Sequence, residues 1–331
     1  MPFKWNAVFL ACCLGVSALL ASPAAEAARK YNPGHYVALL RSQDSPAYMA
    51  ASLKPGVKGL MKRYSWKSLE PTPGAYNFSE IQSDLHWAAA YGVRLVVMIE
   101  DKTFVAERAT PAYLDSYTRR NRKGGYTLLR WNPYVVDRTQ RLFRALGRFD
   151  GHWAFEGIAT QESALGLDES VLTQNGYTPE KYRDAYLAIF NTAGSALPTS
   201  RIFWFMNYFP RKQEYIAHIA GAMASKGLVM GGPDVLPDDR VLQDMAYPFY
   251  DQFRSKMPLF GQVEGECYAH LHKTCCYPNK YWTAPELFRF ARDRLHVDYM
   301  FWVRVPKPTP SDAQDWFDAL PVIENNPLFN Q

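Results

Sequence analysis

Short apolar runs alternate with helical patterns along almost the whole chain. Eight of these runs have the length of buried strands, and helical patterns separate most of them. The runs cover residues 35–40, 57–64, 94–99, 153–160, 201–206, 228–230, 258–263 and 298–305. On about 300 residues, this count predicts a single (β/α)₈ TIM barrel. A doubly wound sheet is the alternative, but no G-x-G-x-x-G motif follows any of these runs.

The first 28 residues have the layout of a secretory signal peptide. Lys4 gives a short basic start, residues 7–20 form an apolar run, and Ala25-Glu26-Ala27 offers a cleavage site. The run is shorter than a membrane span needs, although a retained anchor is the alternative. No later run is long enough to cross a bilayer. We therefore expect a signal peptide over residues 1–28, one barrel domain over residues 29–331, and a secreted or periplasmic protein without stable membrane insertion.

The charge pattern does not favour a nucleic-acid partner. The net charge is +5, and Lys and Arg are scattered apart from the cluster Arg119-Arg120-Asn121-Arg122-Lys123. Such a cluster is more often a solvated loop than a nucleic-acid site. It lies in an excursion over residues 103–130 that is too long for a plain connection. We expect this excursion to be a functional loop over one end of the barrel.

Three cysteines lie close together after the signal segment. They are Cys267, Cys275 and Cys276. In an exported protein, this grouping predicts one disulfide, from Cys267 to Cys275 or Cys276, with one thiol left over. His270 and His272 lie in the same loop, but the spacing fits no zinc template and an oxidising compartment disfavours thiolate ligands. We therefore expect a disulfide and no metal.

Carboxylates stand at the ends of two runs that a barrel brings together. Gln161 and Glu162 directly follow the fourth run, and Glu264 and Glu266 follow the seventh. The active sites of barrel enzymes lie at the carboxyl ends of the strands. The other strand ends supply Arg63 and Trp66, Glu100 and Asp101, Asn207 and Tyr208, Asp234, and Trp302 and Arg304. Two facing carboxyl groups can cleave a glycosidic bond and aromatic rings can pack on sugars, so the pattern predicts a carbohydrate substrate.

One segment carries a family resemblance. Trp66-Lys-Ser-Leu-Glu-Pro-Thr-Pro-Gly-Ala-Tyr-Asn-Phe78 resembles the segment after the second strand in clan A glycoside hydrolases. It is closest to the W-x-x-L-E-P-x-x-G-x-Y-D-F pattern of the β-galactosidase-like and xylosidase-like members. The resemblance implies a retaining (β/α)₈ enzyme with an acid/base Glu ending strand four and a nucleophile Glu ending strand seven. The family usually has Asn before the acid/base, in contact with the sugar 2-hydroxyl; this chain has Gln161, a longer amide that could still donate there.

These positions lead to specific roles. We expect Glu162 to be the general acid/base and Glu264, which directly ends the seventh run, to be the nucleophile. Glu266, two residues on and hence on the same face, is the alternative nucleophile. Arg63 is expected to hold the nucleophile ionised. The expected substrate-binding residues are Arg63, Trp66, Gln161, Asn207, Tyr208 and Trp302, and no cofactor is expected. A barrel that binds or holds glycan without cleaving it is the alternative function.

Overall fold

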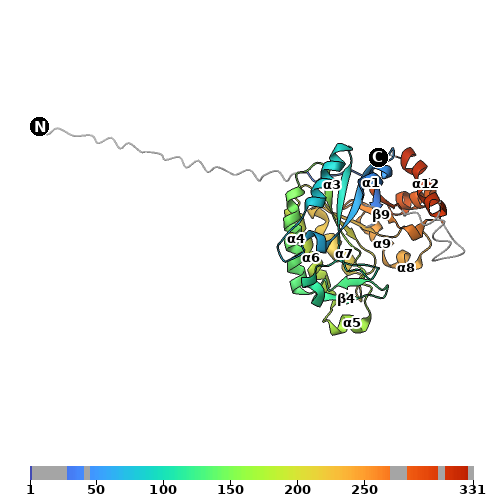
Figure 1. Ribbon diagram of the computed structural model, residues 1–331. Helices are drawn as coiled ribbons and strands as arrows, with labels where there is room; N and C mark the ends of the chain where they lie inside the picture. The colour runs from blue at the N-terminus through green and yellow to red at the C-terminus, as the bar shows by residue number, and fades with distance from the viewer. Residues whose placement is uncertain (2–27, 41–44, 269–281, 305–309, 327–331) are drawn as a thin grey trace.

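The computed structural model is a closed barrel of eight parallel strands with helices around it (Figure 1). It describes residue 1 and residues 28–40, 45–268, 282–304 and 310–326. The strand order around the barrel is β1-β10-β9-β8-β7-β6-β3-β2. The two strands that this order omits, β4 and β5, form a separate antiparallel hairpin. The predicted (β/α)₈ TIM barrel is confirmed.

The strands of the barrel agree with the expected runs to within about two residues at each end. They are β1 (Gly34–Leu39), β2 (Val57–Ser65), β3 (Arg94–Glu100), β6 (Phe155–Thr160), β7 (Arg201–Phe205), β8 (Leu228–Gly232), β9 (Leu259–Val263) and β10 (Tyr299–Val303). The hairpin strands are β4 (Thr118–Arg120) and β5 (Tyr126–Leu128). Because β3 pairs directly with β6, the hairpin lies outside the barrel.

Most of the helices surround the barrel, and one short helix, of residues 169–174, lies over the cavity at its mouth. The helices are α1 (Pro46–Ser52), α2 (Trp66–Leu69), α3 (Ser79–Ala90), α4 (Pro133–Leu146), α5 (Glu169–Gln174), α6 (Pro179–Ala196), α7 (Tyr215–Met223), α8 (Arg240–Met245), α9 (Tyr247–Phe253), α11 (Ala284–Arg289) and α12 (Pro310–Asn325). The sequence predicts one helix over residues 239–254, but Pro248 in the first turn of α9 lacks an N–H group and the helix is divided there. The short α1 is not predicted from the sequence; Ser45 caps it by accepting from the backbone of Tyr48.

Two apolar layers pack on the two faces of the sheet. The interior of the barrel is filled by aromatic and aliphatic side chains that include Tyr36, Met98, Phe203, Phe260 and Phe301. A larger cluster lies between the strands and the surrounding helices. Alternate residues of one strand enter these two layers, because successive side chains in a strand point to opposite faces. This packing fixes which strand residues can reach the barrel mouth.

A buried carboxyl group lies inside the barrel at its amino-terminal end. Glu156 of β6 is fully buried and accepts hydrogen bonds from the hydroxyl of Tyr299 at 2.9 Å and the side-chain amide of Asn32 at 2.7 Å. Burial raises the pKa of Glu156 above its ordinary value, and the two hydrogen bonds offset part of that effect. Glu156 lies near the start of β6, whereas Glu162 follows the end of that strand, so the two carboxyl groups lie at opposite ends of the barrel.

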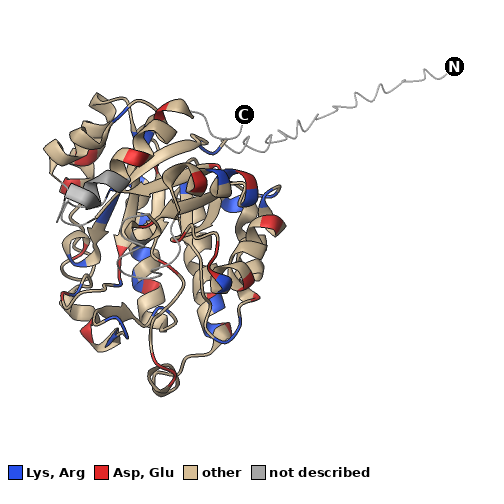
Figure 2. Cartoon of the chain, turned by 90° about the vertical axis from the view of Figure 1, so that its right-hand side faces the viewer, with Lys and Arg blue, Asp and Glu red and all other residues tan. Residues whose placement is uncertain are grey.

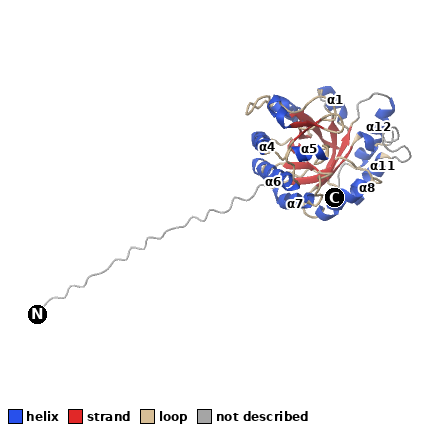
Figure 3. Cartoon of the chain, turned by 90° about the horizontal axis from the view of Figure 1, so that it is seen from below, coloured by secondary structure: helices blue, strands red, loops and turns tan. Residues whose placement is uncertain are grey.

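The exposed surface carries mixed charges. Basic and acidic residues are interspersed over the helices that face the viewer in Figure 2. The helix α5 and the hairpin strand β4 lie at the same end of the molecule (Figure 1), and in the view from below α5 stands over the middle of the ring of strands (Figure 3). Within the described ranges, no helix has both the length and the hydropathy to cross a membrane.

Candidate active site

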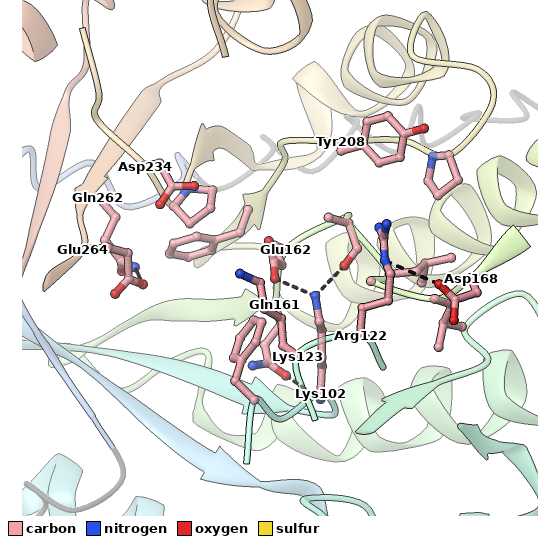
Figure 4. A pocket seen from close by; sticks show the side chains of 18 of the residues that line it. Lys102, Arg122, Lys123, Gln161, Glu162, Asp168, Tyr208, Asp234, Gln262 and Glu264 are labelled. Atoms are coloured by element: carbon pink, nitrogen blue, oxygen red, sulfur yellow. Dashed lines mark hydrogen bonds and ion pairs between the residues drawn. The ribbon is translucent and has the colours of Figure 1, made fainter. Parts of the chain in front are cut away.

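A cavity of about 900 Å³ opens at the carboxyl end of the barrel (Figure 4). Each of several strands contributes a residue at or just after its carboxyl end. The contributors are Arg63 (β2), Met98 and Lys102 (β3 and the loop after it), Gln161 and Glu162 (after β6), Phe205 and Tyr208 (β7 and after), Asp234 (after β8), and Gln262 and Glu264 (β9 and after). The loop over residues 164–168 and α5 form a further wall. Strand ends therefore converge on one cavity, as the barrel predicts.

Glu162 is held by two donors inside this cavity. The ammonium group of Lys102 donates to Oε1 at 2.6 Å, and the side-chain amide of Asn207 donates to Oε2 at 2.6 Å. The side chain of Glu162 is 18% exposed, so the carboxyl group still reaches the cavity. The two contacts fix the orientation of the carboxyl group. Asn207, expected to bind substrate, thus orients Glu162.

Lys102 is a site residue that the sequence did not single out. Its side chain is buried, and its ammonium group also donates to the carbonyl of Ala164 at 2.7 Å and lies 4.8 Å from the ring centre of Phe104. Burial lowers the pKa of Lys102, and the negative charge of Glu162 offsets part of that change. Its place directly after the third strand is the one signal that points to it.

The backbone around Glu162 is fixed by residues from β3 and the loop before α4. Arg130 forms two hydrogen bonds with the carboxylate of Asp101, at 2.6 and 2.7 Å, and donates to the carbonyl of Glu162 at 2.6 Å. The side-chain carbonyl of Gln161 accepts from the N–H groups of Asp101 and Lys102, at 2.8 and 2.6 Å. Asp101 and the carbonyl of Gln161 are therefore occupied in joining the ends of β3 and β6.

Glu264 reaches the same cavity from the end of β9. Nη2 of Arg63 lies 3.5 Å from its Oε1, and the side-chain amide of Gln262 donates to the same oxygen. The side chain of Glu264 is 24% exposed. The backbone of Glu266 lies in the short 3₁₀ turn Gly265–Cys267, and its side chain is outside the described part. Glu264 and Glu162 line the same cavity (Figure 4), and Arg63 lies beside Glu264.

The comparisons with known proteins show what else has this fold. No protein-family model and no curated protein sequence matches the chain. GH5_18 from Streptomyces cattleya, in complex with GlcNAc, is similar with a TM-score of 0.58 at 14% identity, over 90% of this chain and 79% of that one. Endo-glycoceramidase II from Rhodococcus sp. has a TM-score of 0.53 at 14% identity, over 83% and 74% of the two chains. The catalytic domain of β-amylase from Paenibacillus polymyxa has a TM-score of 0.54 at 9% identity, over 89% and 100%.

These likenesses establish the barrel fold. At such low identity they assign no activity to the chain. What they add to the geometry is that the same arrangement of strands occurs in proteins whose names describe action on, or binding to, sugars. Any assignment of chemistry must therefore come from the residues of this cavity.

Two expected substrate-binding residues, Trp66 and Trp302, do not line the cavity. Trp66 is 1% exposed and donates from its indole N–H to the carboxylate of Glu70 at 2.9 Å. Trp302 is fully buried and donates to Nδ1 of His35 at 3.0 Å. Both side chains pack in the layer between strands and helices. The expectation was wrong because a position at a strand end does not by itself turn a side chain toward the barrel mouth.

The segment that carries the family resemblance has a structural role here. Glu70 is fully buried and accepts from Trp66, from the N–H of Gly74 at 2.7 Å and from the hydroxyl of Tyr113 at 2.7 Å. Arg138 of α4 pairs with the same carboxylate. The tryptophan and glutamate of the segment thus anchor the loop after β2 to the helical layer.

Other residues supply the apolar surface of the cavity. Tyr208 is 42% exposed and Phe104 is similarly exposed at the rim, while Phe205 is buried at the base. Tyr208 was expected from the sequence, whereas Phe104, inside the long excursion, was not. Arg304, another strand-end residue, donates to the carbonyl of Tyr48 and the hydroxyl of Ser52 in α1 and is not among the residues that line the cavity.

The cysteine cluster lies largely outside the described residues. Cys267 is fully buried directly after β9, in the turn that follows Glu264. Its expected partners, Cys275 and Cys276, and the histidines His270 and His272 fall outside the described ranges. The disulfide stays a prediction. Among the described residues, no group of three His, Cys, Asp or Glu side chains is arranged to hold a metal ion.

Proposed function

We propose that the chain is a secreted glycoside hydrolase of the retaining type, acting on an oligosaccharide or polysaccharide. The observation that carries the proposal is that Glu162 and Glu264, from strands β6 and β9, line one open cavity at the carboxyl end of a (β/α)₈ barrel. Retaining glycosidases need one carboxyl group to protonate the leaving oxygen and one carboxylate to attack the sugar. The resemblance of residues 66–78 to clan A glycoside hydrolases and the sugar-related names of the structural neighbours support the same function.

The surroundings of Glu264 suit the nucleophile. Arg63 supplies a positive charge and Gln262 a hydrogen bond to Oε1, and both favour a carboxylate. In the first step, Glu264 attacks the anomeric carbon while Glu162 gives its proton to the departing oxygen, so that a glycosyl ester and a free alcohol form. In the second step, water attacks the anomeric carbon, Glu162 takes its proton, and Glu264 leaves as a carboxylate.

Lys102 holds Glu162 in position for both steps. Its ammonium group donates to Oε1 of Glu162 at 2.6 Å and to the carbonyl of Ala164 at 2.7 Å, so it fixes the carboxyl group against the loop that lines the cavity. A carboxyl group held in this way is already oriented toward the reacting oxygen when the substrate binds.

The same ion pair favours a second candidate function. A carboxylate that is permanently paired with Lys102 and Asn207 could serve to bind the hydroxyl groups of a sugar without cleaving it. A glycan-binding barrel would then use Tyr208 and Phe104 as stacking surfaces. Turnover separates the two functions.

The test is hydrolysis by the purified mature protein. A panel of aryl glycosides and polysaccharides is incubated with the wild type, with Glu162→Gln and with Glu264→Gln, and released product is measured. Glu169→Gln is the matched control, because Glu169 lines the cavity rim but pairs with Arg211. We expect turnover by the wild type and the control, loss in both other variants, and retention of anomeric configuration in the product by proton NMR. Binding without turnover on every substrate would favour the glycan-binding barrel.

A further inference from the structure

A basic turn lies at the rim of the cavity, between strands β4 and β5. Residues 119–123 carry four cationic side chains in a row of five. The sequence predicts a solvated loop, and Arg122 and Lys123 are both exposed. They also line the same cavity as Glu162, whereas the neighbouring Arg120 is exposed and is not one of the lining residues. Half of the cationic cluster thus faces the cavity.

The turn is held in place by buried hydrogen bonds. Asn121 is buried; its side-chain carbonyl accepts from the N–H of Gly125 at 3.1 Å and its amide donates to the carbonyl of Thr103 at 2.9 Å. The N–H of Arg122 donates to the carbonyl of Gly166 at 2.9 Å, which ties the turn to the loop that follows Glu162. Because the backbone of the turn is already fixed beside the cavity, little backbone entropy is lost when a ligand binds to the two cationic side chains.

The cations deeper in the cavity are already engaged. Lys102 pairs with Glu162 at 2.6 Å and Arg63 lies 3.5 Å from Glu264. Each of the two inner cations therefore has an inner carboxylate as its partner. A charged ligand would not find an available positive group there.

The cations at the rim are weakly engaged by comparison. Arg122 lies 3.9 Å from Asp168, and both side chains are about two-thirds exposed, so the attraction between them is weak. The Lys123 side chain makes no hydrogen bond or ion pair with any residue in the described ranges. Glu169, the next acidic residue on this rim, is taken up by Arg211 at 2.6 Å. Arg122 and Lys123, labelled in Figure 4, therefore leave positive charge on this side of the rim.

We propose that Arg122 and Lys123 form an anion subsite and that the substrate is a glycan carrying carboxylate or sulfate groups. The inference rests on the proposed glycosidase function. An arginine guanidinium can bind either group through two parallel N–H···O bonds, and the lysine ammonium adds a second positive charge. Binding of the anion displaces Asp168 from Arg122, which costs little because that pair is long and exposed.

The test measures affinity for matched charged and neutral polymers. All proteins carry Glu264→Gln, so that no polymer is cleaved during calorimetric titration. The probes are a polyuronate and its carboxyl-reduced form, and a sulfated polysaccharide and its desulfated form. The variant Arg122→Gln/Lys123→Gln is compared with Arg120→Gln/Arg148→Gln, which removes two exposed charges elsewhere.

We expect the protein that carries only Glu264→Gln to bind one of the charged polymers at least tenfold more tightly than its neutral form, a difference of about 1.4 kcal/mol. The cavity variant is expected to lose this preference and the control variant to keep it. The pair of polymers that shows the preference identifies the group as carboxylate or sulfate. Equal affinity for charged and neutral forms, no binding to either, or an equal loss in the control variant would overturn the proposal.

Hydrolysis measured separately distinguishes the two proposals. If the protein with Glu264 intact cleaves neutral glycans and does not prefer charged ones, the glycosidase function is supported and the anion subsite is contradicted. If binding to charged polymers depends on Arg122 and Lys123 but no glycan is cleaved, the anion subsite is supported and the glycosidase function is contradicted.

Discussion

The Nζ atom of Lys102 lies 2.6 Å from Oε1 of Glu162 and 2.7 Å from the carbonyl oxygen of Ala164. A buried ammonium group thus joins the proposed acid/base residue to the loop that covers the cavity. This contact fixes the position of the carboxyl group in the cavity. Its removal is therefore expected to reduce turnover.

Replacing Lys102 by methionine is expected to lower kcat by about tenfold or more, because the carboxyl group of Glu162 loses the donor that holds it in place. Turnover is measured with an aryl glycoside that the wild type cleaves. Lys67→Met, which removes a cation from an exposed pair with Glu107, serves as the control. Unchanged turnover in Lys102→Met would contradict the positioning role of Lys102.

Glu162→Gln is expected to reduce turnover on poor leaving groups by about 10²-fold or more, because the amide cannot protonate the departing oxygen. With an activated aryl leaving group, which departs without a proton, the loss in the first step should be much smaller. Steady-state rates over a series of leaving groups give this dependence. The same loss on every substrate would indicate that Glu162 serves only to hold the site together.

Glu264→Ala is expected to abolish turnover and to regain it with added azide, since the small anion can occupy the vacated space and attack the sugar. The product would be a glycosyl azide, identified by mass spectrometry. Glu266→Ala is the comparison and should retain measurable activity. Rescue in Glu266→Ala alone would transfer the role of nucleophile to Glu266.

Glu156→Gln is expected to stabilise the protein near neutral pH. The folded pKa of Glu156 is raised above its ordinary value of 4.5, so the native state binds more protons than the unfolded state. Glu156 contributes its full stability to the fold below pH 4.5, and this contribution is lost as the pH rises through the folded pKa. The loss is about 1.4 kcal/mol for each unit by which the folded pKa exceeds the unfolded pKa. Thermal unfolding of the two proteins should converge in acid and diverge toward neutrality. Equal unfolding temperatures for the two proteins at all pH values would show that ionisation of Glu156 does not lower the stability of the fold.

The disulfide predicted from Cys267 to Cys275 or Cys276 is checked by peptide mapping of the exported, non-reduced protein. Cys267 lies in the 3₁₀ turn that follows Glu264, so a bridge from it would restrain the loop beside the proposed nucleophile. Closing so short a loop is expected to stabilise the fold by a few kcal/mol at most. Three free thiols in the mature protein would rule the bridge out.

The fold and the two glutamates could be predicted from the sequence for a common reason. Apolar runs of strand length identify the strands, and a barrel brings the residues that follow those runs to one end. That reasoning places Glu162, Asn207, Tyr208 and Glu264 around one cavity without further information.

The errors and omissions also have physical causes. In β10, Phe301 and Val303 point into the barrel, so the intervening Trp302 points to the helical layer; alternation along the strand was the signal that could have excluded it from the cavity. Lys102 was not assigned a role, because its function depends on a long side chain reaching from the end of β3 to the end of β6. The position of Lys102 just after the third strand was the one signal, and that position alone does not show which residue its side chain reaches.

The β4–β5 hairpin is inserted between two strands that pair with each other as though it were absent. The ladder between β3 and β6 extends from Leu95 to Ile99, with a register shift between Leu95 and Val96. Lys102 and Arg130, at the two ends of the insertion, secure the position of Glu162. The parts that would carry out the chemistry and the part that would choose the glycan are thus separable along the chain. During evolution, a turn of different charge could replace this one and change which glycan is bound, while the barrel and the pair of glutamates stay the same.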